Sequence, residues 1–293
     1  MNHRNTLALL LLGLQFGCDM KDGVSNGSLD MQTLEHDGET REYFLYTPTT
    51  ENTESAMPLL FNFHGFGGTA ESQLDWSDFR SLADTHGFLL IYPQGTELDG
   101  STHWNSGLPG PDNKSTADDF GFIEAVIDEI SANHNVDANR IYATGYSNGG
   151  FMSYSLACYR SDVFAAIAPV SGTMLNDFEG DCAPTRPVSV LSVNGTDDGV
   201  VPYNGGTEGF HAIPDVLDYW VTENNTASEP EVVNVSDAIE HSLYSGGNDG
   251  VSISHYKIDG GDHVWFSDDF GGKDLATVVW DFLSAYDLNG TRE

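Results

Sequence analysis

One serine in the chain is bracketed by glycines at a spacing that suits nucleophilic chemistry. Ser147 stands between Gly145 and Gly149, within the stretch RIYATGYSNGGFMSY. A β-branched and aromatic run precedes this serine and a helix-like run follows it, which predicts a strand-to-helix junction. A sharp turn there leaves no room for neighbouring Cβ atoms, which both glycines lack. The pattern indicates either an ordinary turn of small residues or a serine presented for nucleophilic attack.

A serine hydroxyl is a weak nucleophile at neutral pH, so it needs a histidine base that an acid orients. After a strand–serine–helix turn these partners follow in the order acid, then histidine, each at the end of a later strand. Asp197 and Asp198 follow a predicted strand at 187–195, and His263 follows one at 251–259. Each could instead be an ordinary turn aspartate or loop histidine. Three such residues in this order favour a catalytic triad.

An oxyanion formed at that serine would need hydrogen-bond donors close by. A helix that begins at Asn148 would direct its free N–H groups and its positive dipole end toward the oxyanion. Earlier in the chain, in FNFHGFGG, His64 is poorly placed to act as a base, but Gly65 or Phe66 can supply a second backbone N–H. No histidine pair has HExxH or similar spacing, so we expect no catalytic metal and no cofactor.

Strands and helices alternate along the chain that must position these residues. Besides the elements already named, we expect a hairpin that turns at Asp37–Gly38, strands at 58–65, 88–95, 140–147 and 164–172, and helices at 75–86, 118–136, 148–159, 214–225 and 273–286. This alternation indicates an α/β protein with a mostly parallel sheet covered on both faces. Ligands bind at the carboxyl ends of such strands. With no internal repeat and no later linker, we expect one catalytic domain over 31–293.

The first 30 residues have the features of a targeting segment followed by a tether. A short basic start precedes the apolar run Leu7–Leu14, which is too short to span a bilayer, and Cys18 follows a glycine as at a lipoprotein processing site. We therefore expect a signal peptide at 1–17, a polar tether at 18–30, and export. Plain secretion to the medium or periplasm and a lipid anchor at Cys18 on the cell surface both stay open.

The charge balance limits the kinds of partner. Eleven Lys and Arg residues against 45 Asp and Glu residues give a net charge of −34. Such a surface repels phosphate backbones, so we expect no nucleic acid partner, and no membrane contact beyond an anchor at Cys18. We expect a monomer. Export would place Cys158 and Cys182 in an oxidising compartment, which favours a disulfide over two buried free thiols.

From about Arg41 to Tyr286 the chain resembles the secreted polyhydroxybutyrate depolymerase and feruloyl esterase family of α/β-hydrolases. The resemblance rests on REYFLYTP, FHGFGG, ADTHGFLLIYPQG, DDFGFIEAVIDEI, GYSNGGFMSYSLAC, FAAIAPVSGT, NGTDDGVVPY and GGDHVWF, in this order and spacing. It implies an α/β-hydrolase fold and a serine esterase with Ser147 as nucleophile. The family's Gly-Thr-x-Asp-x-x-Val-Pro pattern aligns Asp198 with the acid, and its histidine matches His263.

The resemblance also implies that Cys158 pairs with Cys182. The family often has Gly-Gly-Gly-His and Trp-Pro around the histidine, whereas this chain has Asp262 before His263 and Phe266 after Trp265. These departures leave the base in place and bear on substrate preference.

The resemblance implies an ester substrate. Both feruloyl-type (hydroxycinnamoyl) esters on polysaccharide and short 3-hydroxyalkanoate or polyester chains are open. We count Trp104, Trp265 and His64 as candidate substrate-binding residues, with plain packing as the alternative for the two tryptophans. Two other functions are weighed against this one: a serine peptidase on the same fold, and a non-catalytic surface lipoprotein that binds a ligand.

Overall fold

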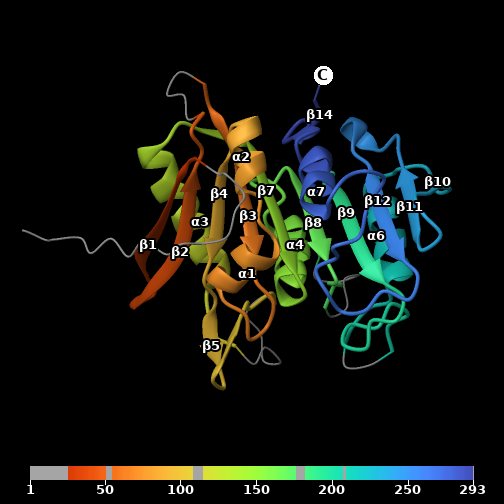
Figure 1. Cartoon of the computed structure of the whole chain (residues 1–293), viewed down its shortest axis with the longest axis horizontal. Helices are drawn as coiled ribbons and strands as arrows, with labels where there is room; N and C mark the ends of the chain where they lie inside the picture. The colour runs from red at the N-terminus through yellow and green to blue at the C-terminus, as the bar shows by residue number, and fades with distance from the viewer. Residues whose placement is uncertain (1–25, 51–54, 108–114, 176–181, 207–208, 293) are drawn as a thin grey trace, which may run out of the picture.

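Ten strands form one sheet with the order β1-β2-β4-β3-β7-β8-β9-β12-β11-β10 (Figure 1). The computed structural model describes residues 26–50, 55–107, 115–175, 182–206 and 209–292. The strands of this sheet are β1 (Ser28–His36), β2 (Glu39–Thr47), β3 (Met57–Phe63), β4 (Leu89–Pro93), β7 (Val136–Tyr146), β8 (Ala166–Val170), β9 (Ser189–Gly195), β10 (Glu231–Asn234), β11 (Ile239–Tyr244) and β12 (Ile253–Ile258). Within this order, every pair of neighbouring strands from β4 to β12 is parallel, and the pairs toward the two edges of the sheet are antiparallel. The expected mostly parallel sheet is confirmed.

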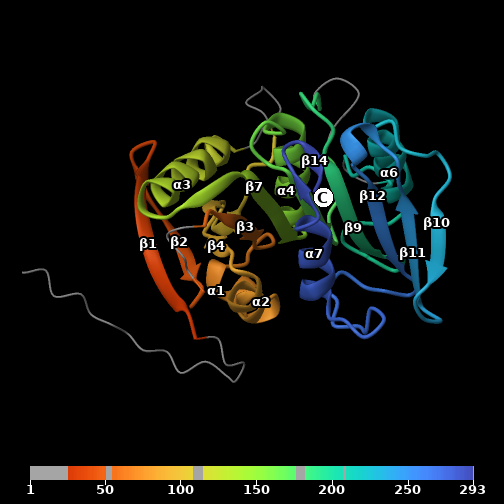
Figure 2. The ribbon, with the colours of Figure 1, turned by 90° about the horizontal axis from the view of Figure 1, so that it is seen from above.

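Helices cover both faces of this sheet (Figure 2). On one face lie α3 (Asp119–Asn133), α4 (Asn148–Tyr159) and α6 (Ile213–Glu223), and on the other lie α1 (Ala70–Trp76), α2 (Arg80–His86) and α7 (Leu275–Leu283). Because both faces are covered, the central strands β3, β4, β8 and β9 are buried at every residue. Their near-continuous apolar sequences are the ones expected of strands with no solvent face.

The sequence predicts one helix at 75–86, but the structure has two separate helices, α1 and α2. The prediction is therefore wrong for the residues between them. α1 ends at Trp76, where the backbone N–H of Ser77 donates to the carbonyl of Gln73. The Ser77 carbonyl then accepts from the Asn62 side chain at 3.1 Å and from the Tyr92 hydroxyl at 2.7 Å. Because these tertiary partners occupy that carbonyl, it is not free for a continuing helix, and α2 starts afresh at Arg80.

The N-terminal boundary also differs from the expected one. β1 begins at Ser28 and pairs with β2, so the last residues assigned to the tether belong to the sheet. The expected signal peptide at 1–17 and Cys18 lie outside the described residues. Among the helices that the structure describes, none combines the length and apolarity needed to cross a bilayer.

A disulfide joins Cys158, on α4, to Cys182, as expected. The two cysteines are 24 residues apart in the sequence and their Cα atoms are 4.7 Å apart. The bond therefore ties the helix that follows Ser147 to the segment that leads into β9.

We predict that replacing both Cys158 and Cys182 by alanine lowers the free energy of unfolding by about 3 kcal/mol, because the unfolded chain regains the entropy of an open loop of this length. Urea unfolding of the wild type and the double variant measures the difference. Two free thiols at these positions in unreduced protein, or equal unfolding free energies, would contradict the prediction.

Candidate active site

Ser147 sits on a sharp turn between β7 and α4. Its φ of 53° and ψ of −115° lie in a region that residues with a side chain rarely adopt. The glycines beside it make the turn sterically allowed. A Cβ atom on Gly145 would come within 2.6 Å of the Gly149 carbonyl carbon, and one on Gly149 within 2.2 Å of the Phe63 carbonyl oxygen. The turn therefore needs glycine at both positions.

Three strand ends bring together the residues expected to form a triad. Ser147 follows β7, Asp198 follows β9, and His263 follows β12. The Ser147 Oγ lies 2.9 Å from His263 Nε2, and His263 Nδ1 lies 2.7 Å from Asp198 Oδ2. A proton on Nδ1 faces the carboxylate in this arrangement, which leaves Nε2 free to accept the serine proton.

Asp198, rather than Asp197, contacts the histidine. Its side chain is only 3% exposed, and its Oδ1 accepts the backbone N–H groups of Val200 at 2.8 Å and Val201 at 2.7 Å. Asp197 is exposed, and its backbone N–H donates to the Gly261 carbonyl. The two amides hold the Asp198 carboxylate so that its other oxygen points at the imidazole.

The loop after β3 passes directly over the serine. A Cβ atom on Gly65 would lie 3.4 Å from the Ser147 Cβ and 2.9 Å from the Tyr146 ring, so this approach also requires glycine. Within the described part of the chain, the backbone N–H groups of Phe66 and Asn148 have no hydrogen-bond partner. Unpaired amides beside a nucleophile are the groups from which an oxyanion hole is built.

His64 supports this loop from inside the protein. It is 1% exposed, its Nδ1 lies 2.8 Å from the Gly65 carbonyl, and its Nε2 accepts the Gly95 N–H at 2.9 Å. Burial lowers the pKa of His64 to about 4, so the ring is neutral near pH 7. The interpretation of His64 as a substrate-binding residue is therefore corrected, because a side chain so deeply buried cannot reach a substrate.

Trp104 is likewise a supporting residue. It is 2% exposed, and its indole N–H donates to the His64 carbonyl at 3.0 Å. Its interpretation as a wall for the substrate is corrected for the same reason. Trp265 is only partly buried and packs edge-on against Phe79, with ring centroids 6.2 Å apart. Phe266, one of the departures from the family pattern, is buried in the core.

A chain of hydrogen bonds connects Asn148, the residue after the nucleophile, to a buried ion pair. The Asn148 side chain accepts from the Trp104 backbone N–H at 2.6 Å and donates to the Trp104 carbonyl at 3.0 Å. The next residue, Asn105, donates its N–H to Asp119 Oδ2 at 2.7 Å, and Asp119 Oδ1 accepts from Arg41 at 2.7 Å. The Arg41 and Asp119 side chains are 6% and 0% exposed. The sequence signal for this pair is the strand alternation, which places Arg41 on the same buried face of β2 as Tyr43 and Leu45.

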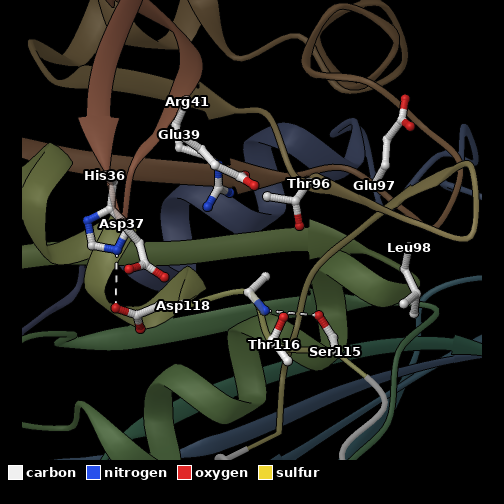
Figure 3. A pocket seen from close by; sticks show the side chains of 11 residues that line it. His36, Asp37, Glu39, Arg41, Thr96, Glu97, Leu98, Ser115, Thr116 and Asp118 are labelled. Carbon is white, nitrogen blue, oxygen red and sulfur yellow. Dashed lines mark hydrogen bonds and ion pairs between the residues drawn. The ribbon is translucent and has the colours of Figure 1, made fainter.

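A polar cavity of about 370 Å³ lies beside Arg41 (Figure 3). It is bounded by the β1–β2 turn, by the hairpin of β5 (Thr96–Leu98) and β6 (Ser101–His103), and by the residues before α3. Carboxylate and hydroxyl side chains dominate its walls, and none of the triad residues lines it. In the described residues, no group of three or more His, Cys, Asp or Glu side chains is arranged to hold a metal ion.

The family model for the esterase PHB depolymerase family matches residues 41–194, which is more than half of the chain. The chain belongs to the esterase PHB depolymerase family. The matched range ends in β9, so it includes Ser147 and stops before Asp198 and His263.

Several curated proteins are similar to the chain over most of its length. It is 31% identical to feruloyl esterase B of Piromyces equi over 85% of this chain and 46% of that protein. It is 29% identical to a bifunctional acetylxylan esterase/xylanase of Neocallimastix patriciarum over 86% of this chain and 34% of that protein. The chain thus spans less than half the length of these two relatives. It is also 26% identical to a probable feruloyl esterase C of Aspergillus niger, of which it covers 88%.

Solved structures confirm the α/β-hydrolase fold. An acetyl xylan esterase from Aspergillus awamori superposes with a TM-score of 0.62, covering 87% of this chain and 99% of that one at 14% identity. A ferulic acid esterase from Anaeromyces mucronatus gives a TM-score of 0.59, covering 91% and 93% at 14% identity. At such low identity the likeness concerns the fold alone.

We predict that Asp119→Asn lowers the free energy of unfolding by about 3 kcal/mol, because it leaves the Arg41 charge buried without its counter-ion. Asp281→Asn is the matched control, since Asp281 pairs with Lys273 at the same 2.7 Å but both side chains are about half exposed. The control should lose less than about 1 kcal/mol. Urea unfolding measures both variants, and equal losses would show that the buried pair does not anchor the fold.

Proposed function

We propose that the chain is an exported serine carboxylic-ester hydrolase that works through an acyl-enzyme. The observation that carries the proposal is the continuous hydrogen-bonded path from Ser147 through His263 to Asp198, with distances of 2.9 and 2.7 Å. Membership of an esterase family and similarity to curated feruloyl and acetylxylan esterases support it.

The geometry supports a two-step mechanism. His263 Nε2 takes the Ser147 proton as Oγ attacks the ester carbonyl, and Asp198 stabilises the imidazolium that forms. The tetrahedral oxyanion accepts hydrogen bonds from the N–H of Asn148 and from that of Gly65 or Phe66. His263 then protonates the departing alcohol. Water, deprotonated by the same base, hydrolyses the acyl-enzyme, so no step needs a cofactor.

Export is part of the proposal. The disulfide between Cys158 and Cys182 suits an oxidising compartment, as does the signal-like N-terminal sequence. We propose that one catalytic domain extends from β1 to the last residues of the chain. Whether Cys18 carries a lipid is decided by mass spectrometry of the exported protein.

Exposed apolar side chains gather beside the triad and indicate the kind of ester. Phe66 and Trp76 are 60% and 62% exposed, and Val200 and Val264 are 59% and 42% exposed. Phe66 is on the loop after β3, and Val264 directly follows His263. The backbone N–H of Val200 donates to the triad aspartate, Asp198. The Trp76 ring packs against the ring of Tyr146, the residue before the nucleophile, with the two ring centroids 5.9 Å apart. We call these four residues the apolar rim.

Exposed apolar side chains next to triad residues suit an ester with an apolar part next to its carbonyl, because contact removes apolar surface from water on both sides. An aromatic ring of a hydroxycinnamoyl ester fits this description, and so does the chain of a short 3-hydroxyalkanoate polyester. We propose hydroxycinnamoyl esters first, because curated relatives named feruloyl esterases match the chain.

We predict that Ser147→Ala lowers kcat for p-nitrophenyl acetate by at least about three orders of magnitude, because the covalent path is lost. Asp198→Asn should lower it by about 10³- to 10⁴-fold through the wrong histidine tautomer. Asp197→Asn is the matched control and should stay within about threefold, because that carboxylate does not reach the imidazole.

Stopped-flow assays and detection of an acetylated Ser147 by mass spectrometry test the assignment. A Ser147→Ala protein that keeps the wild-type rate would refute it, and the reverse ranking of the two aspartates would move the acid to Asp197. Turnover of a peptide anilide at a rate above that of the ester would instead favour a peptidase.

We predict that Trp76→Ala reduces kcat/KM for methyl ferulate by about five- to tenfold, because an aromatic contact worth about 1 kcal/mol is lost. For p-nitrophenyl acetate, whose acyl group is a single methyl, the same variant should stay within twofold. Val232→Ala, on β10, removes another exposed apolar side chain away from the rim and should change neither rate. Equal losses on both esters would show that Trp76 supports the site without contacting the acyl group.

A further inference from the structure

The proposed base lies on a segment without regular secondary structure. His263 is between the end of β12 at Ile258 and the start of α7 at Leu275, and no helix or strand forms in the interval. Its imidazole bonds to Asp198 and Ser147 and its backbone N–H donates to Asp262 of the same segment, but these bonds leave the carbonyl side of the backbone free to shift. Because proton transfer requires alignment within a fraction of an ångström, something must hold that backbone.

Two hydroxyl groups hold consecutive carbonyls of this segment. The Tyr146 hydroxyl donates to the His263 carbonyl at 2.8 Å, and the Ser171 hydroxyl donates to the Val264 carbonyl at 2.8 Å. Both bonds join residues about a hundred positions apart in the sequence. They hold the two consecutive peptide groups on either side of the Val264 Cα atom.

Both donors stand on backbone that the sheet fixes. Tyr146 is the last residue of β7 and directly precedes Ser147, whose N–H donates to the Val170 carbonyl at 2.9 Å. Ser171 directly follows β8, and its own N–H donates to the Val193 carbonyl at 2.9 Å. One phenol ring thus links the backbone next to the nucleophile to the backbone of its base.

The Tyr146 ring has little freedom to move. Its centroid lies 5.0 Å from that of the His263 ring and 5.9 Å from that of Trp76, and Gly65 packs against its edge. Burial raises the pKa of Tyr146 to about 12, with smaller contributions from the Asp198 and Asp262 charges. The phenol therefore keeps its proton, and remains a donor, throughout the neutral range.

Ser171 occupies a position where glycine would be easier to accommodate. Its φ is +49°, in the left-handed region, and it is fully buried. A serine in this conformation costs backbone free energy that a glycine would not. What serine has and glycine lacks is the hydroxyl, and that hydroxyl bonds to the His263 segment.

We propose that Tyr146 and Ser171 are positioning residues that form a two-hydroxyl clamp on the backbone of His263 and Val264, and so set the distance between the proposed base and Ser147. The inference rests on the proposed esterase function. Neither clamp residue reacts with the substrate, so losing the clamp should slow chemistry and leave substrate binding unchanged.

The test removes one hydroxyl at a time with Tyr146→Phe and Ser171→Ala. Each variant should lower kcat for p-nitrophenyl acetate about fivefold, with KM within twofold, since one hydrogen bond is worth about a factor of five in an equilibrium. The double variant should lose more than the product of the two single losses, because each bond partly compensates for the other. Proton NMR should show the low-field His263 Nδ1–H resonance in the wild type and its broadening in the variants.

Tyr142→Phe is the matched control. Tyr142 lies on the same strand, and its hydroxyl donates to a backbone carbonyl, that of Tyr286, at 2.7 Å, while the residue is fully buried. The control should lower Tm as much as Tyr146→Phe does but leave kcat and the NMR signal unchanged. If Tyr146→Phe does not fold, Ser171→Ala still tests the clamp.

The possible failures are distinguishable. If both single variants keep kcat within twofold of an active wild type, or if Tyr142→Phe slows the reaction equally, the clamp is wrong. If the wild type hydrolyses no ester, the proposed function is wrong. The clamp is then judged by the NMR resonance alone, and an unchanged resonance in Tyr146→Phe and Ser171→Ala overturns it.

Discussion

Backbone crowding around Ser147 is the constraint on which the whole site depends. The end of β3 passes so close to the first turn of α4 that the Phe63 carbonyl oxygen occupies the space of any side chain at position 149. At this contact Ser147 has a positive φ and α4 begins at the next residue, so the free amides of the first helical turn lie beside the serine. The strained turn persists because the neighbouring strands on both sides of β7 fix the path of its backbone.

The two partners of the serine are held in different ways. Asp198 is fixed by backbone amides of its own turn, so its orientation is local in origin. His263 has one local bond, from its backbone N–H to Asp262 Oδ1 at 2.9 Å, and the other contacts that hold its segment come from the ends of β7, β8 and β9. The loop after β3 is supported in the same distant manner, through the buried side chains of His64 and Trp104. The site is thus rigid only as far as the sheet is rigid.

Local patterns in the sequence predict much of this arrangement and miss the rest for identifiable reasons. The order of Ser147, Asp198 and His263, each after an apolar run, is enough to place them at one edge of a parallel sheet, where the structure has them. Periodicity says nothing about burial of a single polar side chain, so His64 was open to interpretation as a ligand-binding residue. The break after α1 depends on Tyr92 and Asn62, which no window around residue 77 contains. β10, exposed at every residue, has no apolar alternation to reveal it.

The negative surface and the apolar rim together explain how the chain can expose Phe66 and Trp76 beside its site. Two copies that met rim to rim would bury apolar surface, and this would favour association. Each copy also carries a net charge of −34, and the repulsion between two such charges opposes close approach at moderate ionic strength. A neutral ester experiences the attraction of the rim without that repulsion. The acidic composition therefore disfavours anionic partners and a second copy of the chain at the rim, and it leaves the contact with an uncharged ester unopposed.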